Sequence, residues 1–220
     1  KRSPKYSVLH FAIAVEILLK ARLIIEDWSL VVLKNANKAK YIKGDFVSVN
    51  LYEAVKRLRN IVGGNITEAE YRAFQKLSRH RNKVIHFYHS EITSDWKSEE
   101  LQQILKEQCE CWYYLKNLFT KKWRTHFEAQ VFLFESLDEK MKHHWEYLYE
   151  IFDQKKGALT EQRNKGKKID NCFYCAFDAV LYEYSNSVLS TGVCAVCGCI
   201  NSIIKIKCEC GASLTLINEG

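Results

Sequence analysis

The chain has 220 residues, of which 47% are hydrophobic and 27% are charged, a composition typical of a globular protein with one medium-sized and one small domain. A single proline and nine glycines argue against a loop-rich all-β protein. The net charge of +7 is unevenly distributed, because residues 1–168 contain 31 basic and 21 acidic side chains whereas residues 169–220 contain 2 and 5. The basic N-terminal part therefore favours a polyanionic partner such as nucleic acid.

The first two thirds of the chain show the apolar periodicity of α-helices. We predict helices over approximately residues 7–27, 50–62, 67–89, 98–118 and 123–152, with a polar connection at 34–48. Asn50 and Thr67 are predicted N-caps, because Glu53 and Glu70 follow three residues later. The apolar opening segment is interrupted by charged residues too often for a bilayer helix, and no signal segment is visible. We therefore expect a cytoplasmic protein without a membrane span.

The character of the sequence changes after residue 155. Residues 156–168 are polar, basic and contain glycine, as expected for a linker, and short apolar runs at 179–184, 203–207 and 214–217 predict strands. The predicted fold class is mainly α. A helical bundle over 1–155 and a basic linker over 156–168 precede a small β-rich, cysteine-rich zinc ribbon over 169–220.

Seven of the nine cysteines lie between residues 172 and 210, and cysteines in a chain without a secretion signal favour metal ligands over disulfides. Two Cys-x2-Cys pairs have the spacing of a four-thiolate zinc ribbon: Cys172, Cys175, Cys194 and Cys197. A rival set combines Cys194 and Cys197 with Cys208 and Cys210. Zinc is structural in either case, because four thiolates leave no open coordination position. Cys109 and Cys111 are interpreted as buried or free thiols.

The stretch from Leu77 to His89 contains three histidines and three cationic side chains inside a predicted helix. Arginine matches phosphate oxygens, and histidine titrates near neutrality, so Arg81 and His86 suit cleavage of a phosphodiester. They lie about 140° apart around a helix, whereas Asn82 and His86 share a face. One helix alone makes a poor site. Two copies of the helix packed around a twofold axis would bring the Arg81 and His86 side chains of both copies into one groove, which predicts a homodimer.

The string from Arg81 to Tyr88, late in a helical domain, resembles the Arg-x4–6-His signature of the HEPN superfamily, and the opening segment Leu9–Arg22 resembles the first helix of such domains. The resemblance covers about residues 5–155. It implies a dimeric helical bundle that acts as a metal-independent endoribonuclease, often a toxin or an anti-phage defence effector. An antitoxin or another defence-system protein is then an expected partner.

Residue by residue, the resemblance implies that Arg81 and His86 are catalytic and that Asn82 is the polar residue following the arginine. Glu16, paired with Lys20, would orient Arg81. The RNA-binding candidates are Arg79, Lys83 and Lys20. Tyr88 completes Arg-x4-His-x-Tyr, which resembles toxins whose tyrosine is modified by a partner enzyme.

Two other functions are compatible with the same residues. The helical bundle and ribbon can form a non-catalytic module that binds RNA or a protein, or the ribbon can belong to a DNA-binding, transcription-linked protein. His86 lies between Ile85 and Phe87 and can also be read as a core histidine, whereas His80 and His89 are expected to be solvated.

Overall fold

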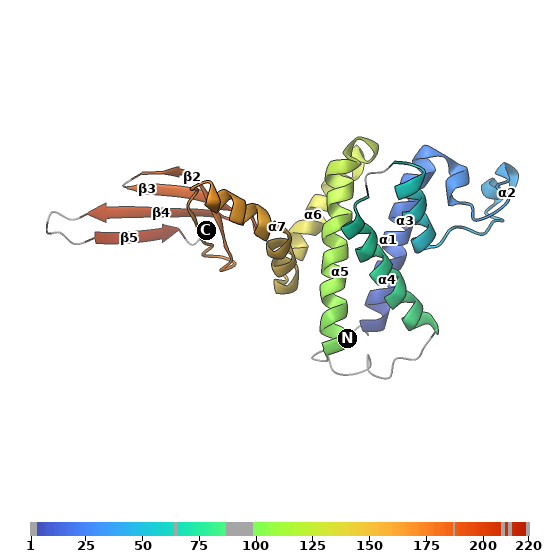
Figure 1. Ribbon diagram of the computed structural model, residues 1–220, viewed down its shortest axis with the longest axis horizontal. Helices are drawn as coiled ribbons and strands as arrows, with labels where there is room; N and C mark the ends of the chain where they lie inside the picture. The colour runs from blue at the N-terminus through green and yellow to red at the C-terminus, as the bar shows by residue number, and fades with distance from the viewer. Residues whose placement is uncertain are drawn as a thin grey trace. The chain divides into compact units, whose positions relative to one another are not determined.

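The computed structural model describes residues 4–63, 66–86, 99–186, 188–207, 210 and 213–218. Its helices are α1 (Pro4–Glu26), α2 (Lys38–Lys43), α3 (Leu51–Asn60), α4 (Glu68–His86), α5 (Glu99–Asn117), α6 (Val131–Met141) and α7 (Trp145–Asn164) (Figure 1). Its strands are β1 (Ile169–Asn171), β2 (Asp178–Ser185), β3 (Leu189–Cys194), β4 (Ile200–Lys207) and β5 (Ser213–Asn218). The chain forms two compact units, Lys1–Asp138 and Glu139–Gly220, here called the helical unit and the C-terminal unit.

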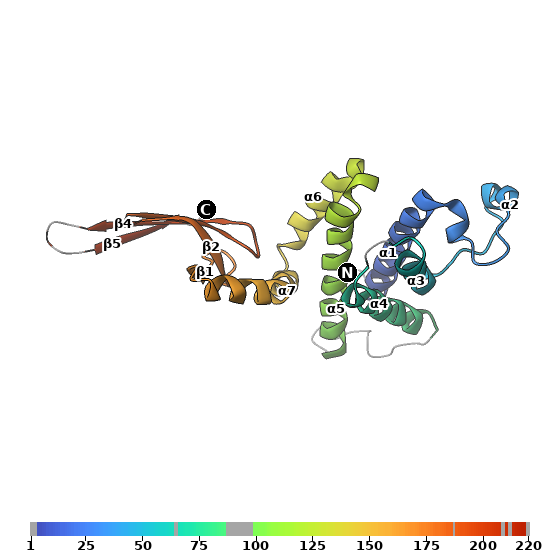
Figure 2. The ribbon, with the colours of Figure 1, turned by 45° about the horizontal axis from the view of Figure 1, so that its top comes forward.

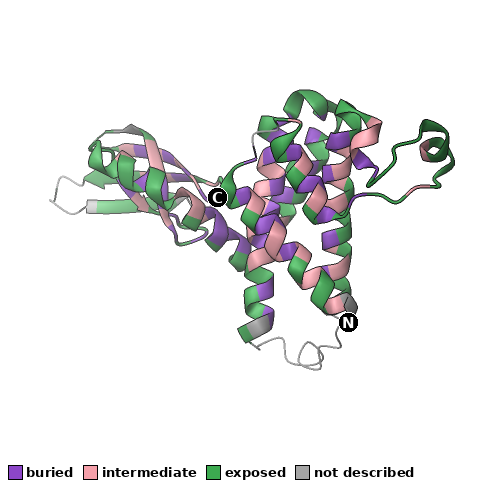
Figure 3. Cartoon of the chain, turned by 45° about the vertical axis from the view of Figure 1, so that its right-hand side comes forward, coloured by how far each residue is buried: buried purple, intermediate pink, exposed green. Residues whose placement is uncertain are grey.

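The core of the helical unit is built on one face of α1. Apolar side chains three or four residues apart on this helix are buried, namely Val8, Ala12, Val15, Leu19 and Leu23. Helix α1 packs against α3 and α4, and α4 packs against α5, which contribute Leu58, Phe74 and Leu115 to the core. Figure 3 shows the buried residues along these helices. A helical N-terminal part with a β-rich C-terminal part is therefore confirmed.

Both predicted N-caps are confirmed. The Asn50 side chain accepts a hydrogen bond from the backbone N–H of Glu53 (2.9 Å). At the start of α4, the Glu70 carboxylate accepts from the Thr67 N–H (2.7 Å) and the Glu70 N–H donates to the Thr67 hydroxyl (3.3 Å). This reciprocal pair gives a hydrogen-bond acceptor to two backbone N–H groups at the start of the helix. Helix α4 therefore begins where the local sequence predicts.

The connection between α1 and α3 begins and ends in a short two-stranded stem. The Leu33 N–H donates to the Val47 carbonyl (2.8 Å) and the Val49 N–H donates to the Val31 carbonyl (2.9 Å). Arg57 of α3 donates to the carbonyls of Leu30, Val32 and Leu33 at 3.0, 2.8 and 3.3 Å. Hydrogen bonds from a charged donor contribute roughly 1.5–3 kcal/mol each. Arg57 therefore anchors this stem to the helical unit.

The C-terminal unit contains α7 and an antiparallel meander. The strand order is β1-β2-β3-β4-β5, and every neighbouring pair is antiparallel. Figure 2 shows β4 and β5 lying side by side. The predicted strands correspond to β2, β4 and β5, whereas β1 and β3 were not predicted. Strand β3 reads Leu-Ser-Thr-Gly-Val-Cys and has little of the apolar density that marks a strand.

Two sequence predictions on organisation need correction. Helix α7 continues to Asn164, so residues 156–164 are helical rather than part of a linker, and the division between units falls after Asp138. Most side chains in 156–164 are exposed, which gives a helical surface the polar composition of a linker. The predicted helix over 123–152 is interrupted by short 3-10 turns before α6 and by extended backbone at His144 before α7.

Within the described parts of the chain, none of the helices combines the length and apolar character needed to cross a lipid bilayer.

Candidate functional site

Arg81, on α4, extends its guanidinium group toward α1. Its guanidinium Nη2 is 3.9 Å from the Oε2 of Glu16 on α1, and its Nη1 donates to the Asn82 side-chain oxygen (3.0 Å). Lys20 donates to Glu16 (2.6 Å) and to the Ser48 hydroxyl (2.9 Å). Glu16 therefore lies between two cationic side chains, Lys20 on the same helix and Arg81, which is 65 positions away in the sequence.

Arg81 and Asn82 also line a polar groove of about 580 Å³. Its lining residues are Asn50, Tyr52, Gln75, Ser78, Arg79, Arg81 and Asn82. The groove therefore contains three of the predicted site residues, from α4, together with two residues from the start of α3. Its two guanidinium groups and its amide and hydroxyl groups can donate hydrogen bonds to an anion, and arginine is well suited to phosphate.

Sequence reasoning missed four of these lining residues. Gln75, Ser78 and Asn82 follow helical spacing on α4, so one face of the helix could have been extended backwards from Asn82. Asn50 was recognised as a helix cap and not as a groove residue. Tyr52 comes to the groove by the packing of α3 against α4, for which the sequence contains no local signal.

The other predicted residues of the site are distributed as follows. Lys20 is engaged with Glu16 and Ser48. Lys83 is exposed and is not among the groove-lining residues. His86 is the last residue of α4, and its side chain lies outside the described part of the structure, as does Tyr88. Their assigned roles therefore stay predictions.

His80 is not solvated, contrary to expectation. Its ring is half-buried and bonds to the Glu107 carboxylate of α5, and Lys76 forms a second link from α4 to Glu110 of α5 (2.9 Å). Burial opposes ionisation of Glu107, but hydrogen bonds from Gln103 and His80 outweigh it and lower the pKa of Glu107. These ion pairs join α4 to α5, so His80 has a structural contact.

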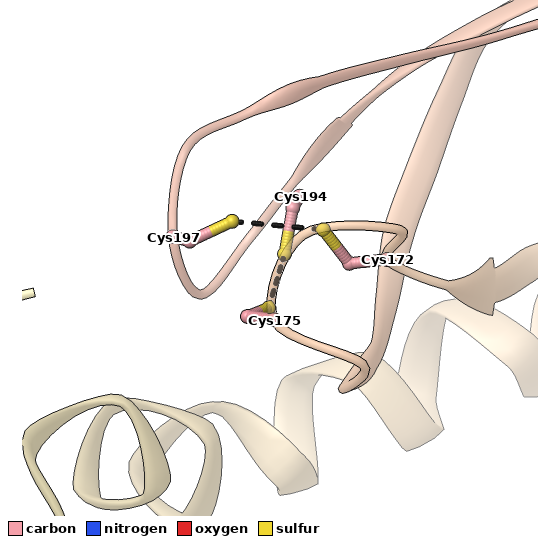
Figure 4. A group of neighbouring side chains, drawn as sticks. All are labelled: Cys172, Cys175, Cys194 and Cys197. Carbon is pink, nitrogen blue, oxygen red and sulfur yellow. Dashed lines mark hydrogen bonds between the residues drawn. The ribbon is translucent and has the colours of Figure 1, made fainter. Parts of the chain in front are cut away.

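Four cysteine sulfurs come together in the C-terminal unit. Cys172, Cys175, Cys194 and Cys197 are buried, and their sulfurs all lie within 4.8 Å of one another. The sulfurs of Cys172 and Cys197 are 3.6 Å apart, as are those of Cys175 and Cys194. Figure 4 shows the four sulfurs pointing toward one another from two loops. This arrangement can hold one metal ion.

The two loops that supply the cysteines are built alike. One joins β1 to β2 and the other joins β3 to β4. In the first, the Cys172 N–H donates to the Phe177 carbonyl and the Ala176 N–H donates to the Cys172 carbonyl, both at 2.9 Å. In the second, the Cys194 N–H donates to the Cys199 carbonyl (2.9 Å) and the Gly198 N–H donates to the Cys194 carbonyl (3.0 Å). Ala176 and Gly198, directly after each second cysteine, both have positive φ, +60° and +83°.

Hydrogen bonds already favour a thiolate in this cluster. The hydrogen bond between the Cys175 and Cys194 sulfurs lowers the pKa of Cys194 to about 5 and raises the pKa of Cys175 far above its usual value. The Asn201 amide lies 3.5 Å from the Cys172 sulfur, and the Val196 N–H lies 3.4 Å from the Cys194 sulfur. Donors of this kind orient thiolate ligands around a metal.

The rival cysteine set is disfavoured. Cys210 is exposed and does not belong to the cluster found among the described residues, while Cys208 lies outside them. Strand pairing decides the choice, because β2 pairs with β3 in a register that sets Val180 opposite Cys194 and so brings the β1–β2 and β3–β4 loops to the same end of the sheet. Cys109 and Cys111 are buried, as expected, and burial, assisted by Glu110, raises the pKa of Cys111.

Helix α7 contacts both cysteine loops. Phe177, which follows the first loop, stacks on Trp145 and Phe152 with ring centroids 4.7 and 4.9 Å apart. Lys155 donates to the Ala195 carbonyl in the second loop. Trp145, Phe152 and Phe177 are therefore packing residues where α7 meets the first cysteine loop.

Comparison with protein-family models, with curated proteins and with solved structures gave no significant match to this chain.

Proposed function

We propose that this protein is a metal-independent endoribonuclease of the HEPN type. The observation that carries the proposal is the placement of Arg81, which lines a polar groove beside Arg79 and Asn82 and is approached from α1 by Glu16. Four of the residues that the resemblance selected, Glu16, Lys20, Arg81 and Asn82, are linked by contacts within and between α1 and α4, and these contacts support the proposal. A purely structural arginine has no need of a groove lined by further hydrogen-bond donors.

The proposed reaction is transesterification within RNA. A base removes the proton of the ribose 2′-hydroxyl, the oxygen attacks the adjacent phosphorus, and the bond to the 5′-oxygen breaks as an acid protonates that leaving group. The products are a 2′,3′-cyclic phosphate and a free 5′-hydroxyl. His86 supplies proton transfer. Arg81 stabilises the additional negative charge that develops on the phosphate oxygens.

Neighbouring side chains have supporting roles in this proposal. Glu16 positions the Arg81 guanidinium, and Lys20 holds Glu16 through the 2.6 Å ion pair. Asn82, which accepts from Arg81, retains its amide N–H groups for a phosphate or ribose oxygen. Arg79 and Lys83, both exposed, contact the RNA backbone on either side.

The proposal includes a homodimer, which the exposed face of α1 supports. Besides its buried stripe, α1 carries exposed apolar side chains on another face at helical spacing, namely Tyr6, Ile13, Ile17 and Ile24. Lys20 lies on this same face, three residues from Ile17 and four from Ile24. A second copy packed on this stripe therefore meets the Lys20–Glu16–Arg81 chain, which brings two sites to one interface.

The dimer is tested by replacing Ile17 with glutamate. An unpaired charge in a buried interface costs several kcal/mol, so Ile17→Glu is expected to convert a dimer into a monomer in sedimentation-velocity measurements. Ile61→Glu, at an exposed position after α3, is the matched control and leaves the dimer intact. A wild-type monomer at all accessible concentrations contradicts this part of the proposal.

We also propose that the four cysteines bind one structural zinc ion. Four thiolates satisfy the tetrahedral preference of zinc and leave no position for substrate, so RNA chemistry is assigned to the Arg81 groove. The family resemblance is the support for a cytoplasmic toxin or anti-phage effector that an antitoxin or another partner protein restrains. Modification of Tyr88 is the corresponding proposal for that restraint.

The nuclease assignment is tested with Arg81. Purified wild-type protein is expected to cleave single-stranded RNA in the presence of EDTA, and Arg81→Ala is expected to reduce the rate by about 100-fold, because removal of one preorganised donor to a transition-state anion typically has this size. Arg72→Ala, at a mostly exposed position outside the groove, is the control. Cleavage by Arg81→Ala at the wild-type rate refutes the assigned role, and RNA binding without cleavage by the wild type makes the protein a non-catalytic RNA-binding module.

A further inference from the structure

Residues 33–47 form a small basic lobe on the helical unit. The lobe contains α2 and extends beyond the stem that Arg57 anchors, and Figures 1 and 2 both show α2 standing apart from α1, α3, α4 and α5. Its lysines are Lys34, Lys38, Lys40 and Lys43, all exposed, and Asp45 is its one acidic residue. This excess of positive charge lies in only 15 residues.

The basic lobe has its own small set of stabilising contacts. The Asn37 side chain caps α2 by accepting from the Lys40 N–H (3.1 Å), and Gly44 ends the helix at φ +74°, a conformation that glycine adopts without strain. The Tyr41 ring lies 5.1 Å from Trp28 and 5.2 Å from Phe46. A polar connection of this length would not need caps and an aromatic cluster merely to join two helices.

Three of the four lysines of the lobe are available to a ligand, whereas the Lys38 ammonium lies over the Trp28 and Tyr41 rings, 4.6 and 5.3 Å from their centroids. Among the described residues, Lys34, Lys40 and Lys43 form no ion pair. Lys34 and Lys40 line a depression of about 550 Å³ whose other polar side chains are Asn35, Asn37 and Asp45, so its basic side chains outnumber its acidic one. The lobe also exposes Ile42 (73%) and Val47 (69%). Cations beside exposed apolar groups suit a single-stranded nucleic acid, which offers both phosphates and unstacked bases.

The end of the lobe is connected directly to the candidate site. Ser48, which follows the lobe, accepts a hydrogen bond from Lys20, and Lys20 in turn pairs with the Glu16 that neighbours Arg81. Two residues further on, Asn50 lines the Arg81 groove. A single-stranded nucleic acid that leaves the groove past Asn50 therefore reaches the stem of the lobe.

We propose that the basic lobe binds the backbone of single-stranded RNA beyond the Arg81 groove, with Lys34 and Lys40 each contacting a phosphate. The inference rests on the proposed function for the identity of the polyanion, and it adds a second binding element that lengthens the recognised strand. Continuity with an arginine-lined groove favours RNA over an anionic membrane surface, because a planar bilayer cannot engage both the lobe and a recessed groove along one strand.

The test measures RNA binding without cleavage. The probe is a fluorescein-labelled 12-nucleotide RNA that is 2′-O-methylated throughout, so that no 2′-hydroxyl can react, and the readout is anisotropy over a range of salt concentrations. Lys34→Ala/Lys40→Ala is expected to weaken binding about tenfold near physiological salt and to reduce the slope of log K against log salt by about 1.4, the value for two lost contacts to a single strand. Lys106→Ala/Lys121→Ala removes the same charge at exposed positions outside the lobe and should leave the slope unchanged.

A four-nucleotide version of the probe is a second measurement. If the lobe extends the binding site, the lobe variant and the wild type should bind this short RNA with similar affinity, since its length fits the groove alone. The inference is overturned if Lys34→Ala/Lys40→Ala binds the 12-nucleotide probe as tightly as the wild type. It is also overturned if the control Lys106→Ala/Lys121→Ala loses as much affinity for this probe as the lobe variant. A lobe variant that binds RNA normally but fails to bind phosphatidylserine vesicles that the wild type binds also overturns it, in favour of a membrane contact.

Failure of this inference is distinguishable from failure of the nuclease proposal. Normal RNA binding by the lobe variant, together with EDTA-resistant cleavage by the wild type, eliminates the lobe alone. Weakened RNA binding by the lobe variant without any cleavage by the wild type supports the lobe and eliminates the nuclease.

Discussion

Replacement of Cys172 or Cys194 by serine is expected to remove the bound metal and unfold the C-terminal unit. Each variant deletes a thiolate from a different loop of the buried cluster, in which all four sulfurs lie within 4.8 Å of one another. A structural zinc ion contributes roughly 10–16 kcal/mol of apparent binding free energy to small domains. This contribution is as large as the total stability of roughly 5–15 kcal/mol that most domains have, so the sheet should not survive loss of the ion.

The measurement is metal content by mass spectrometry of the purified protein, followed by tryptophan fluorescence, to which Trp145 is one of five contributors. We expect one zinc ion per wild-type chain and none in Cys172→Ser or Cys194→Ser. Trp145 stacks on Phe177 beside the first cysteine loop, so its emission should change when that loop unfolds. Helical circular dichroism should fall only in part, because the helical unit has its own core.

Two other cysteines provide matched controls. Cys199 is half-buried and Cys210 is exposed, and neither belongs to the four-sulfur cluster. Cys199→Ser and Cys210→Ser should retain one zinc ion. If Cys210→Ser loses the metal while Cys172→Ser retains it, the ligands are the rival set with Cys208 and Cys210, and the assignment made from the four-sulfur cluster is wrong.

The second large effect is expected from His86→Ala. In the proposed reaction His86 transfers the proton of the attacking hydroxyl or of the leaving group, and general acid–base catalysis typically contributes 10²–10⁴-fold. The RNA cleavage rate should therefore fall by about 1,000-fold while RNA binding is retained. The dependence of the wild-type rate on pH should change in the variant, because the imidazole that transfers the proton is absent.

His143→Ala is the control for this experiment, since His143 is exposed and lies in the C-terminal unit. Its cleavage rate and pH profile should match those of the wild type. Persistent cleavage by His86→Ala at the wild-type rate eliminates His86 as acid or base. Loss of helical structure in His86→Ala supports instead the alternative in which this histidine packs in the core.

Features that depend on neighbouring residues were predictable from the sequence. The caps at Asn50 and Thr67 form within four residues, so residue type and spacing suffice to place two helix starts. The Cys-x2-Cys pairs likewise form loops closed by hydrogen bonds within six residues. Such contacts involve little chain-closure entropy and hardly depend on the rest of the fold.

Features that depend on distant pairing were not predictable in this way. The polar run 156–164 has the composition of a linker, yet it continues α7, whose first half packs on Phe177 through Trp145 and Phe152. His80 looks solvated until α5 brings Glu107 to it. In both cases the local sequence fits either interpretation, linker or helix for 156–164 and solvated or paired for His80. Only the tertiary structure distinguished the two.

By itself, the sequence determined a helical N-terminal part, a β-rich C-terminal part with paired cysteine loops, and the residues of one polar helix that suit phosphate chemistry. The tertiary structure decided that Cys172, Cys175, Cys194 and Cys197 share one cluster, and that Glu16 of α1 lies beside Arg81 of α4. It also decided that residues 33–47 are a capped basic lobe rather than a plain connection. The reason is physical: helix caps and loops form from neighbouring residues, whereas clusters and grooves require the burial energy that brings distant segments together.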